Sequence, residues 1–481
     1  MNDLMSKSDH FGHHYDGRNH GQYASLIKKY TSASKRPLNP AEQSQLIRLL
    51  QNFTVTQSWN WRSLTTTLYS FTSAGVFTPH KPMGERVKLT QAALLSKLLD
   101  ATIFKCNQKP QAWDIDAQGI ANLLWVMAKL VDSGKEWPPG LKEAVAELLT
   151  QVNIQKDQFN AQAIANLLWA MAKLVDNGQE RTPELNEAIA VLLSHVNAQK
   201  THLKPQEIAN LLWAMAKLGE FVELNMATST FESLVYQISY NPQFTHHAIL
   251  MSLWGVMVCC ARLSLDSNTN RNHVLEKHMD DLFTRLENIS PVNEEDQSIL
   301  AMAACWLGKP CPVTPYYQTT TSKYQTIFRN QLQSRIPSLK IEEEKSLHSL
   351  PPVDLLLPDH NIIIEVQGPS HYVSGDFKTR NGSTLLKIAL LRKSGFEVIE
   401  IPVNEFWNKG LMNRCIDQIK TRVDTPAQDH GAVSFNIGWT EEAKVTANKG
   451  WQFSDHSYLT AEEHSEQQTR KPKRKRKRKR R

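Results

Sequence analysis

The sequence predicts an α-solenoid of paired helical repeats followed by a small α/β domain. The first observation is a segment that recurs along the middle of the chain and places Trp125, Trp169 and Trp213 at a spacing of 44 residues. The second is a change after residue 321, where short alternating apolar segments replace the helical period. A fixed period of this size is typical of units that bury their apolar faces only against their neighbours.

Each repeat is expected to hold two helices. The second helix of a pair begins at the N-cap residues Asp116 and Asn160 in two copies, and Pro205 opens it in the third. The first helix recurs at 141–149 and 185–193. Trp254 follows Trp213 after 41 residues, and weaker copies surround Tyr69 and Met302.

Charge divides the chain unevenly. The net charge is +7, yet 470–481 contains eleven Lys and Arg among its twelve residues. Without that run, 44 basic residues remain against 48 acidic ones. The body is therefore not basic, and no run of about 18 apolar residues predicts a membrane-spanning helix, so we expect no membrane partner.

These patterns predict four segments. We expect a disordered polar tail at 1–20, a helical array at 21–312, an α/β domain at 321–425 and a flexible tail at 426–481 that ends in the basic run 470–481.

Two sets of residues recur at the repeat period and are candidates for RNA contact. They are the asparagines Asn122, Asn166 and Asn210 and the lysines Lys129, Lys173 and Lys217. The asparagines either contact nucleotides or, as we favour, form a buried ladder between helices. The lysines form either a phosphate-binding stripe or a solvated face. The recurring tryptophans, beside Leu and Met at helical spacing, are expected in the core and not on bases.

The charge of the array leaves its partner open. From Lys109 to Glu223 the sequence has ten Lys and Arg and fourteen Asp and Glu. An acidic array binds a polyanion only if its charges are segregated by face, so a protein partner stays open beside RNA.

The α/β domain is expected to run helix, three strands, helix, strand. The expected elements are a helix at 322–335, strands at 339–345, 353–357 and 362–367, a helix at 383–394 and a strand at 396–401.

This domain resembles a RAP domain, a small unit of the PD-(D/E)XK nuclease superfamily with a restriction-endonuclease-like fold. The resemblance rests on the EVQGPSHY block at 365–372, the TLLK helix at 384–387 and the GFEVI strand at 395–399. The phrase IANLLWAMAKLG at 208–219 resembles octotricopeptide and FAST kinase-like repeats. Both resemblances imply RNA binding.

The nuclease superfamily implies a metal site at named positions. Asp354 and Glu365 would be the ligands of Mg²⁺, Gln367 stands where the superfamily usually has lysine, and Lys387 would supply the missing positive charge. The favoured alternative is a degenerate nuclease fold that binds RNA without cleaving it. His371 is either a general acid or, as we favour, a loop residue that makes hydrogen bonds.

The expected function is an RNA-binding protein in RNA processing or stability, with Mg²⁺-dependent endoribonuclease activity left open. The alternative is a protein-interaction scaffold with an inactive RAP domain, such as a nuclear-targeted bacterial effector. The terminal run fits a nuclear or nucleolar import signal read by an importin-type receptor in a eukaryotic cell. Bacterial cytoplasm, secretion and an organelle stay open. The import signal would comprise Lys471, Lys473, Arg474, Lys475, Arg476 and Lys477.

We predict that deleting 470–481 leaves the melting temperature unchanged and alters only location or non-specific affinity for polyanions. The reason is that a run this highly charged cannot be buried. Thermal melting of the truncated chain and a fluorescent fusion in a eukaryotic cell test the two halves. A large fall in melting temperature would show that the run docks on the folded body.

Overall fold

The computed structural model describes residues 16–34, 51, 59–77, 85–108, 114–131, 141–198, 203–239, 244–266, 273–287, 289–313, 315, 317, 319, 321–347 and 350–424. They fall into two compact units, one extending to Ile115 and the other beginning at Asp116. The expected tail at 426–481 and its basic run lie outside the described residues.

The first unit contains the helices α2 (Gly17–Ser34), α4 (Trp61–Ser73) and α5 (Glu85–Cys106), and α4 packs against both of the others. Helix α2 begins inside the segment 1–20 that the sequence predicted to be a polar tail. The Asp16 side chain accepts a hydrogen bond from the Asn19 backbone N–H at 2.8 Å. His20 is buried and stacks on Trp59 at 5.2 Å. A capped first turn with a buried ring therefore orders this end of the expected tail.

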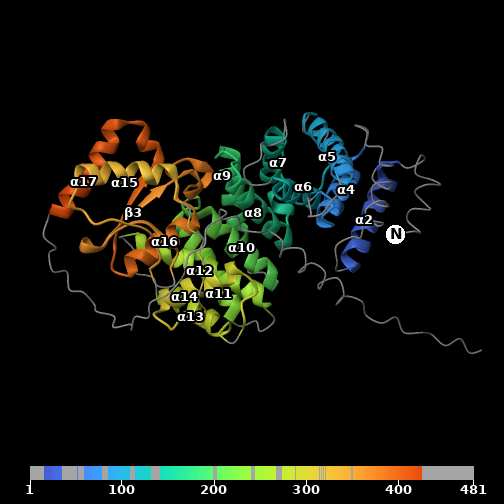
Figure 1. The fold of residues 1–481 in the computed structure, drawn as a ribbon. Coiled ribbons are helices and arrows are strands. Elements are labelled where there is room, and N and C mark those ends of the chain that lie inside the picture. The colour runs from blue at the N-terminus through green and yellow to red at the C-terminus, as the bar shows by residue number, and fades with distance from the viewer. Residues whose placement is uncertain are drawn as a thin grey trace, which may run out of the picture. The chain divides into compact units, whose positions relative to one another are not determined.

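The second unit contains helical repeats built from two rows of helices (Figure 1). One row comprises α6 (Ala117–Leu130), α8 (Ala161–Asp176), α10 (Pro205–Leu218), α12 (His246–Leu265) and α14 (Glu294–Leu307). The other comprises α7 (Leu141–Ile154), α9 (Pro183–Ala198), α11 (Leu224–Ser239) and α13 (His273–Thr284). Each helix packs against the next member of its own row. We call the row that begins with α6 the B row.

The predicted starts of the B-row helices are confirmed. The Asp116 side chain accepts from the Gly119 backbone N–H at 2.7 Å, and Asn160 does the same for Ala163 at 2.8 Å. Pro205 occupies the first turn of α10. These caps satisfy backbone donors that a helix N-terminus leaves free, which explains why the repeats begin at these residues.

The recurring tryptophans form an indole ladder along the B row. The ring centroids of Trp125 and Trp169 are 6.4 Å apart, those of Trp169 and Trp213 are 6.0 Å apart, and those of Trp213 and Trp254 are 6.5 Å apart. Trp169 and Trp213 are buried, whereas Trp125 is half-buried at one end of this run. The core placement expected from the sequence is confirmed for the two buried rings, which leaves no open face for a base.

The recurring lysines belong to the same ladder. Each lies one helical turn after a tryptophan, so both side chains share a face. The Lys129 ammonium lies 4.7 Å from the ring centroid of Trp169, in the next repeat. The Lys217 ammonium lies over Trp213 and Trp254 and 3.3 Å from Asp176. Lys173 is 7% exposed and Lys217 is 8% exposed, so the exposed lysine stripe expected from the sequence is wrong at these positions.

The recurring asparagines are half-exposed and not buried between helices. Asn122 accepts a hydrogen bond from the Gln118 amide at 3.0 Å, and Asn210 accepts one from Gln206 at 2.9 Å. Both bonds lie within one helix. The favoured expectation of a buried inter-helix ladder is therefore wrong, because these asparagines lie at the partly exposed edge of the apolar face.

The α/β domain contains α15 (Lys323–Arg335), β1 (Glu342–Lys345), β2 (Val353–Leu357), β3 (Ile362–Gln367), α16 (Gly382–Lys393), β4 (Glu397–Pro402) and α17 (Lys409–Asp424). The sheet order is β1-β2-β3-β4, antiparallel except for the parallel pair β3 and β4. The predicted order of elements is confirmed, and α17 is an additional helix that the sequence did not predict. Single 3₁₀ turns join the elements at 156–158, 219–221, 358–360, 369–371, 373–375 and 403–407.

The two faces of this sheet have different neighbours. One face packs with α15 and α17 around an apolar cluster that includes Leu355, Ile364, Phe328 and Ile416. Side chains alternate along a strand, so the residues between these face the other way. That second face carries the polar residues of β2 and β3 and lies toward α16, which packs on β4.

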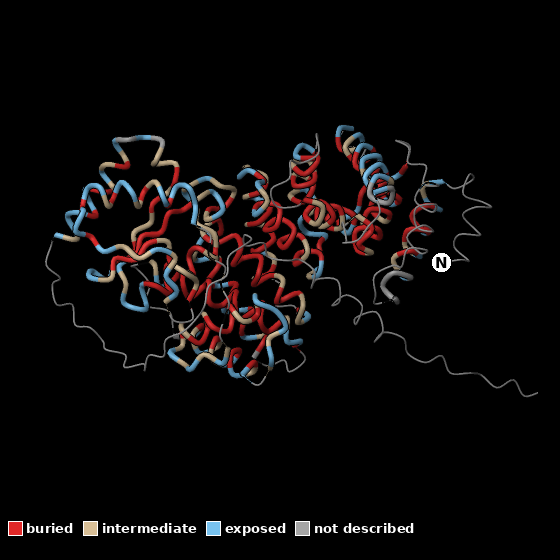
Figure 2. The backbone as a smooth tube through the Cα atoms, in the orientation of Figure 1, coloured by how far each residue is buried: buried red, intermediate tan, exposed pale blue. Residues whose placement is uncertain are grey.

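Helix α16 also packs against α10, α12 and α14 of the B row. A Cβ added at Gly382 would lie 2.0 Å from the Ala216 carbonyl oxygen, so the backbones of α16 and α10 approach in a way that only glycine allows. Figure 2 shows the buried, red segments of these helices where they meet. Helix α12 is long and apolar enough to cross a membrane, but most of it is buried in this unit, as in a core helix.

We predict that Trp169→Ala lowers the free energy of unfolding by roughly 3–5 kcal/mol, the usual cost of truncating a large core side chain. Trp125→Ala should lower the free energy of unfolding clearly less. Its ring is half-buried and contacts one indole of the described ladder, whereas the Trp169 ring contacts two. Chemical denaturation of both variants against the unchanged chain makes the comparison. If both variants lost the same free energy of unfolding, burial of the indole ring would not determine how much each tryptophan stabilises the protein.

Candidate functional site

Four acidic residues form a row across the sheet, one on each strand. The pairing of β1 with β2 places Glu344 opposite Asp354, and the pairing of β2 with β3 places Asp354 opposite Glu365. Glu365 in turn pairs with Glu400 on β4. Residues opposite one another in neighbouring strands share a face, so this carboxylate row lies on the face toward α16.

Lys387 of α16 neutralises the middle of the carboxylate row. Its ammonium lies 2.6 Å from Glu365 Oε2, with Glu365 only 2% exposed and the Lys387 side chain 20% exposed. Asp354 is held by the Val366 backbone N–H, which donates to its Oδ2 at 2.7 Å. The structure thus brings together Asp354, Glu365 and Lys387, which the sequence assigned to one candidate site.

Burial dominates the electrostatics of this cluster. It raises the pKa of Glu365 to about 7, although the Lys387 ammonium acts in the opposite direction. Burial also raises the pKa of Asp354, against the same ammonium. For Lys387, burial lowers the pKa, but the carboxylates of Glu365 and Asp354 outweigh it and hold the pKa above its usual value. Lys387 and the two carboxylates therefore stabilise each other's charged forms, whereas burial and the repulsion between Asp354 and Glu365 oppose ionisation of the carboxylates.

The cluster contains oxygen atoms that fit a hard cation. Glu365 Oε1 and Glu344 Oε1 are buried and have no hydrogen-bond partner. Mg²⁺ is commonly held by one or two carboxylates together with water and substrate phosphates, so Asp354 and Glu365 suit it chemically. Within the described ranges, no group of three or more His, Cys, Asp or Glu side chains is arranged to hold a metal ion. The cluster therefore matches a two-carboxylate site and not a closed metal cage.

Gln367 has partners at both ends of its amide. Its Nε2 donates to Glu400 Oε2 at 2.9 Å, and its Oε1 accepts from the Tyr372 hydroxyl at 2.5 Å. Burial raises the pKa of Tyr372 to about 12, which keeps this hydroxyl protonated as a donor. Gln367 therefore ties β3 to β4 and to the following loop, and its bonded ends do not point at Glu365.

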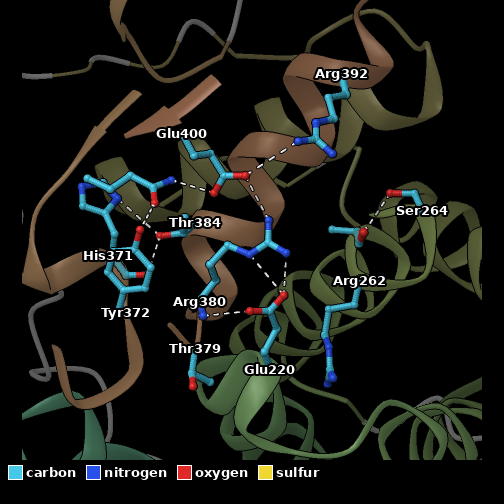
Figure 3. A network of polar contacts seen from close by, with 12 residues as sticks. Glu220, Arg262, Ser264, His371, Tyr372, Thr379, Arg380, Thr384, Arg392 and Glu400 are labelled. Atoms are coloured by element: carbon cyan, nitrogen blue, oxygen red, sulfur yellow. Dashed lines mark hydrogen bonds and ion pairs between the residues drawn. The ribbon is translucent and has the colours of Figure 1, made fainter. Parts of the chain in front are cut away.

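Arg380 joins the α/β domain to the B row through the network in Figure 3. Its guanidinium lies 2.6 Å from Glu220, in the turn after α10, and 3.1 Å from Glu400 on β4. The Arg380 carbonyl accepts from the Glu220 backbone N–H at 3.1 Å. Gly219 has a φ of +51°, and a Cβ there would lie 2.5 Å from the same carbonyl, so glycine is required.

Sequence reasoning missed this network. Glu220 and Arg380 are separated by 160 positions, and neither lies in a sequence motif that predicts its contact with the other.

His371 is a loop residue that makes hydrogen bonds, as favoured from the sequence. Its carbonyl accepts from Thr384 Oγ1 at 3.0 Å and from the Asn381 backbone N–H at 3.1 Å. Burial and the nearby Lys387 charge lower the pKa of its imidazole to about 4. The imidazole is therefore neutral near pH 7 and is poorly suited to act as a general acid there.

We predict that Lys387→Met destabilises the protein in a pH-dependent way. The folded pKa of Glu365 lies above its ordinary value of 4.5, so the folded state binds more protons than the unfolded state between about pH 4.5 and 7. Stability falls as pH rises through that window, and removing Lys387 deepens the fall because Glu365 then ionises without a partner. The loss should be small near pH 5 and roughly 3–5 kcal/mol near pH 8, the usual cost of breaking a buried pair.

Urea denaturation at the two pH values measures this effect. Lys378→Met, which removes an exposed lysine in the loop before α16, is the matched control and should change little at either pH. The same loss at both pH values for Lys387→Met would show that Lys387 does not neutralise Glu365.

Comparison with known families bears on this domain alone. Residues 364–411 match the model of the RAP domain, a family of RNA-binding domains. The matched segment runs from β3 into α17 and contains Glu365, Gln367, Arg380 and Lys387. No curated protein sequence matches the chain significantly. The C-terminal domain, expected from its motifs to resemble RAP domains, is thus confirmed as similar to them over this segment.

Proposed function

We propose that this protein binds RNA and acts in RNA processing or stability. In this proposal the helical repeats form an octotricopeptide-like or FAST kinase-like α-solenoid, and the α/β domain is a restriction-endonuclease-like unit. The match of residues 364–411 to the RNA-binding RAP domain carries the proposal. The mixed four-stranded sheet with helices on both faces supports it.

The repeats contribute to RNA binding through their partly exposed residues. Lys129 and Lys217 lie over the indole ladder and Lys173 is buried, so the three lysines contribute little to phosphate contact in this arrangement. The recurring asparagines are half-exposed and keep amide groups for contact. RNA binding along the repeats therefore rests on the asparagines more than on the lysines.

A second candidate function is Mg²⁺-dependent cleavage of RNA at the carboxylate row. The observation that favours it is the buried, unpartnered Oε1 of Glu365 close to Asp354. When bound, Mg²⁺ would supply an activated water and charge stabilisation for the phosphate. Asp354 and Glu365 would hold the cation. Lys387 would keep Glu365 ionised and add positive charge, while Gln367 would brace β3 against β4.

The proposal includes a targeting role for the terminal basic run 470–481. We place the protein in the nucleus or nucleolus if it functions in a eukaryotic cell, through an importin-type receptor. If the full chain binds protein partners but no RNA, the scaffold function with an inactive RAP domain replaces this proposal.

Cross-linking in the native cell, followed by sequencing of any bound RNA, tests the main proposal. Recovery of specific transcripts supports RNA binding. Recovery of no RNA above the background of an untagged strain would leave the scaffold function in its place.

For catalysis, we predict that Asp354→Asn and Glu365→Gln each abolish metal-dependent cleavage and leave RNA affinity nearly unchanged. Both variants remove a charge needed to hold the cation while keeping the size of the side chain. Cleavage of labelled RNA with Mg²⁺ or with a chelator is measured beside binding. Asp359→Asn, on the turn between β2 and β3, is the control. Cleavage that survives both substitutions would show that this row is not the catalytic site.

A further inference from the structure

The partly exposed edge of the B row repeats one polar pair in three consecutive helices. The pair is a glutamine followed four residues later by an asparagine. It occurs as Gln118 and Asn122 in α6, Gln162 and Asn166 in α8, and Gln206 and Asn210 in α10. All six residues are exposed or half-exposed. Because α8 packs against both α6 and α10, the three pairs lie on adjacent helices in one row.

The hydrogen bond within a pair orients its amides. Gln118 Nε2 donates to Asn122 Oδ1 at 3.0 Å, and Gln206 Nε2 donates to Asn210 Oδ1 at 2.9 Å. This uses one glutamine donor and one asparagine acceptor. In these two pairs the glutamine carbonyl and the asparagine NH₂ remain for a ligand, so each offers one acceptor and one donor group.

A donor beside an acceptor suits the hydrogen-bonding edge of a nucleic-acid base. Asparagine and glutamine amides read bases in this bidentate way, and some helical-repeat proteins read one base per repeat with two or three side chains. The pairs lie near the N-terminal ends of their helices, whereas the α/β domain docks at Ala216, toward the other end of α10. The amide edge is therefore left half-exposed beside the docked RAP-like domain.

We propose that the three Gln–Asn pairs form a base-reading ladder for single-stranded RNA, and that it selects the same base at three successive positions. This inference rests on the proposed RNA-binding function and adds its specificity. The three pairs have the same residues at equivalent positions of three neighbouring helices, and the orienting hydrogen bond is present in α6 and α10. They must then favour one and the same base. The ladder ends at α12, where the equivalent positions are His247 and Met251.

The charge of the array fits recognition through bases and not through phosphates. Two of the three recurring lysines, Lys173 and Lys217, are buried, and the segment from Lys109 to Glu223 has more acidic than basic residues. Base-edge contacts contribute specificity, whereas lysine–phosphate contacts contribute the salt dependence of binding. Removing the ladder should therefore lower affinity for the preferred sequence without changing how affinity depends on salt.

Fluorescence anisotropy of the full chain with four short homopolymer RNAs and one mixed sequence of equal length tests the proposal. One homopolymer should bind more tightly than the other four probes. The triple variant Asn122→Ala, Asn166→Ala, Asn210→Ala should lose roughly 100-fold or more in affinity for that homopolymer, given a factor of about 5–150 for each good bidentate base contact. The salt dependence should be unchanged.

A second set of variants guards against a folding defect in the first. Replacing Gln118, Gln162 and Gln206 by Glu keeps the size and helical character of the side chains but removes the amide donors. It should also abolish the preference among homopolymers. Gln158→Ala, an exposed glutamine in the turn before α8, is the matched control and should bind like the unchanged chain.

The outcomes separate the two proposals. If the unchanged chain binds all the RNAs equally, or if both triple variants bind RNA as it does, the base-reading ladder is wrong while RNA binding stands. A basic peptide with the sequence of residues 470–481 serves as a further probe. If the triple variants bind every RNA like the unchanged chain but bind this peptide less tightly, the edge is a peptide-binding surface and the ladder is again wrong. If the unchanged chain binds none of the RNAs, the proposed function falls together with the ladder.

Discussion

The packing of α16 between two layers is the constraint on which the unit from Asp116 onward depends. One side of this helix covers the polar face of the sheet, and the other lies on α10, α12 and α14. The close approach at Gly382 removes any room for a side chain between α16 and α10. Because both contacts use one short helix, the α/β domain cannot shift on the repeats without breaking its own second layer.

The same packing sets the electrostatics of the candidate site. Burial beneath α16 is what raises the pKa of Glu365, and the lysine that compensates comes from α16 itself. A helix that buries a carboxylate must bring a partner for it, since an isolated buried charge is costly. Arg380 acts in a similar way at the rim, where it bridges Glu220 of the repeats and Glu400 of the sheet. The charge state of the carboxylate row is therefore coupled to how the repeats hold the domain.

The repeats show how one periodic sequence serves two purposes on a single helix. Tryptophan and lysine at the recurring positions pack against their equivalents in the next helix and hold the row together. Glutamine and asparagine, earlier on the same helix, stay partly exposed, and in α6 and α10 they form a hydrogen bond with each other. The large rings and long aliphatic stems gain most from burial, while the short amides lose least by remaining in contact with water.

The sequence by itself determined the helix starts, the pairing of helices and the order of the strands along the chain. These follow from local signals: caps, periodicity and the alternation of side chains along a strand. It also marked the recurring Lys and Asn positions, but not which of them is buried. Tertiary structure decided that, because exposure depends on what the next helix and the docked domain cover. It also decided the partners of Lys387, Gln367 and Arg380, since an ion pair between distant segments leaves no trace in local pattern.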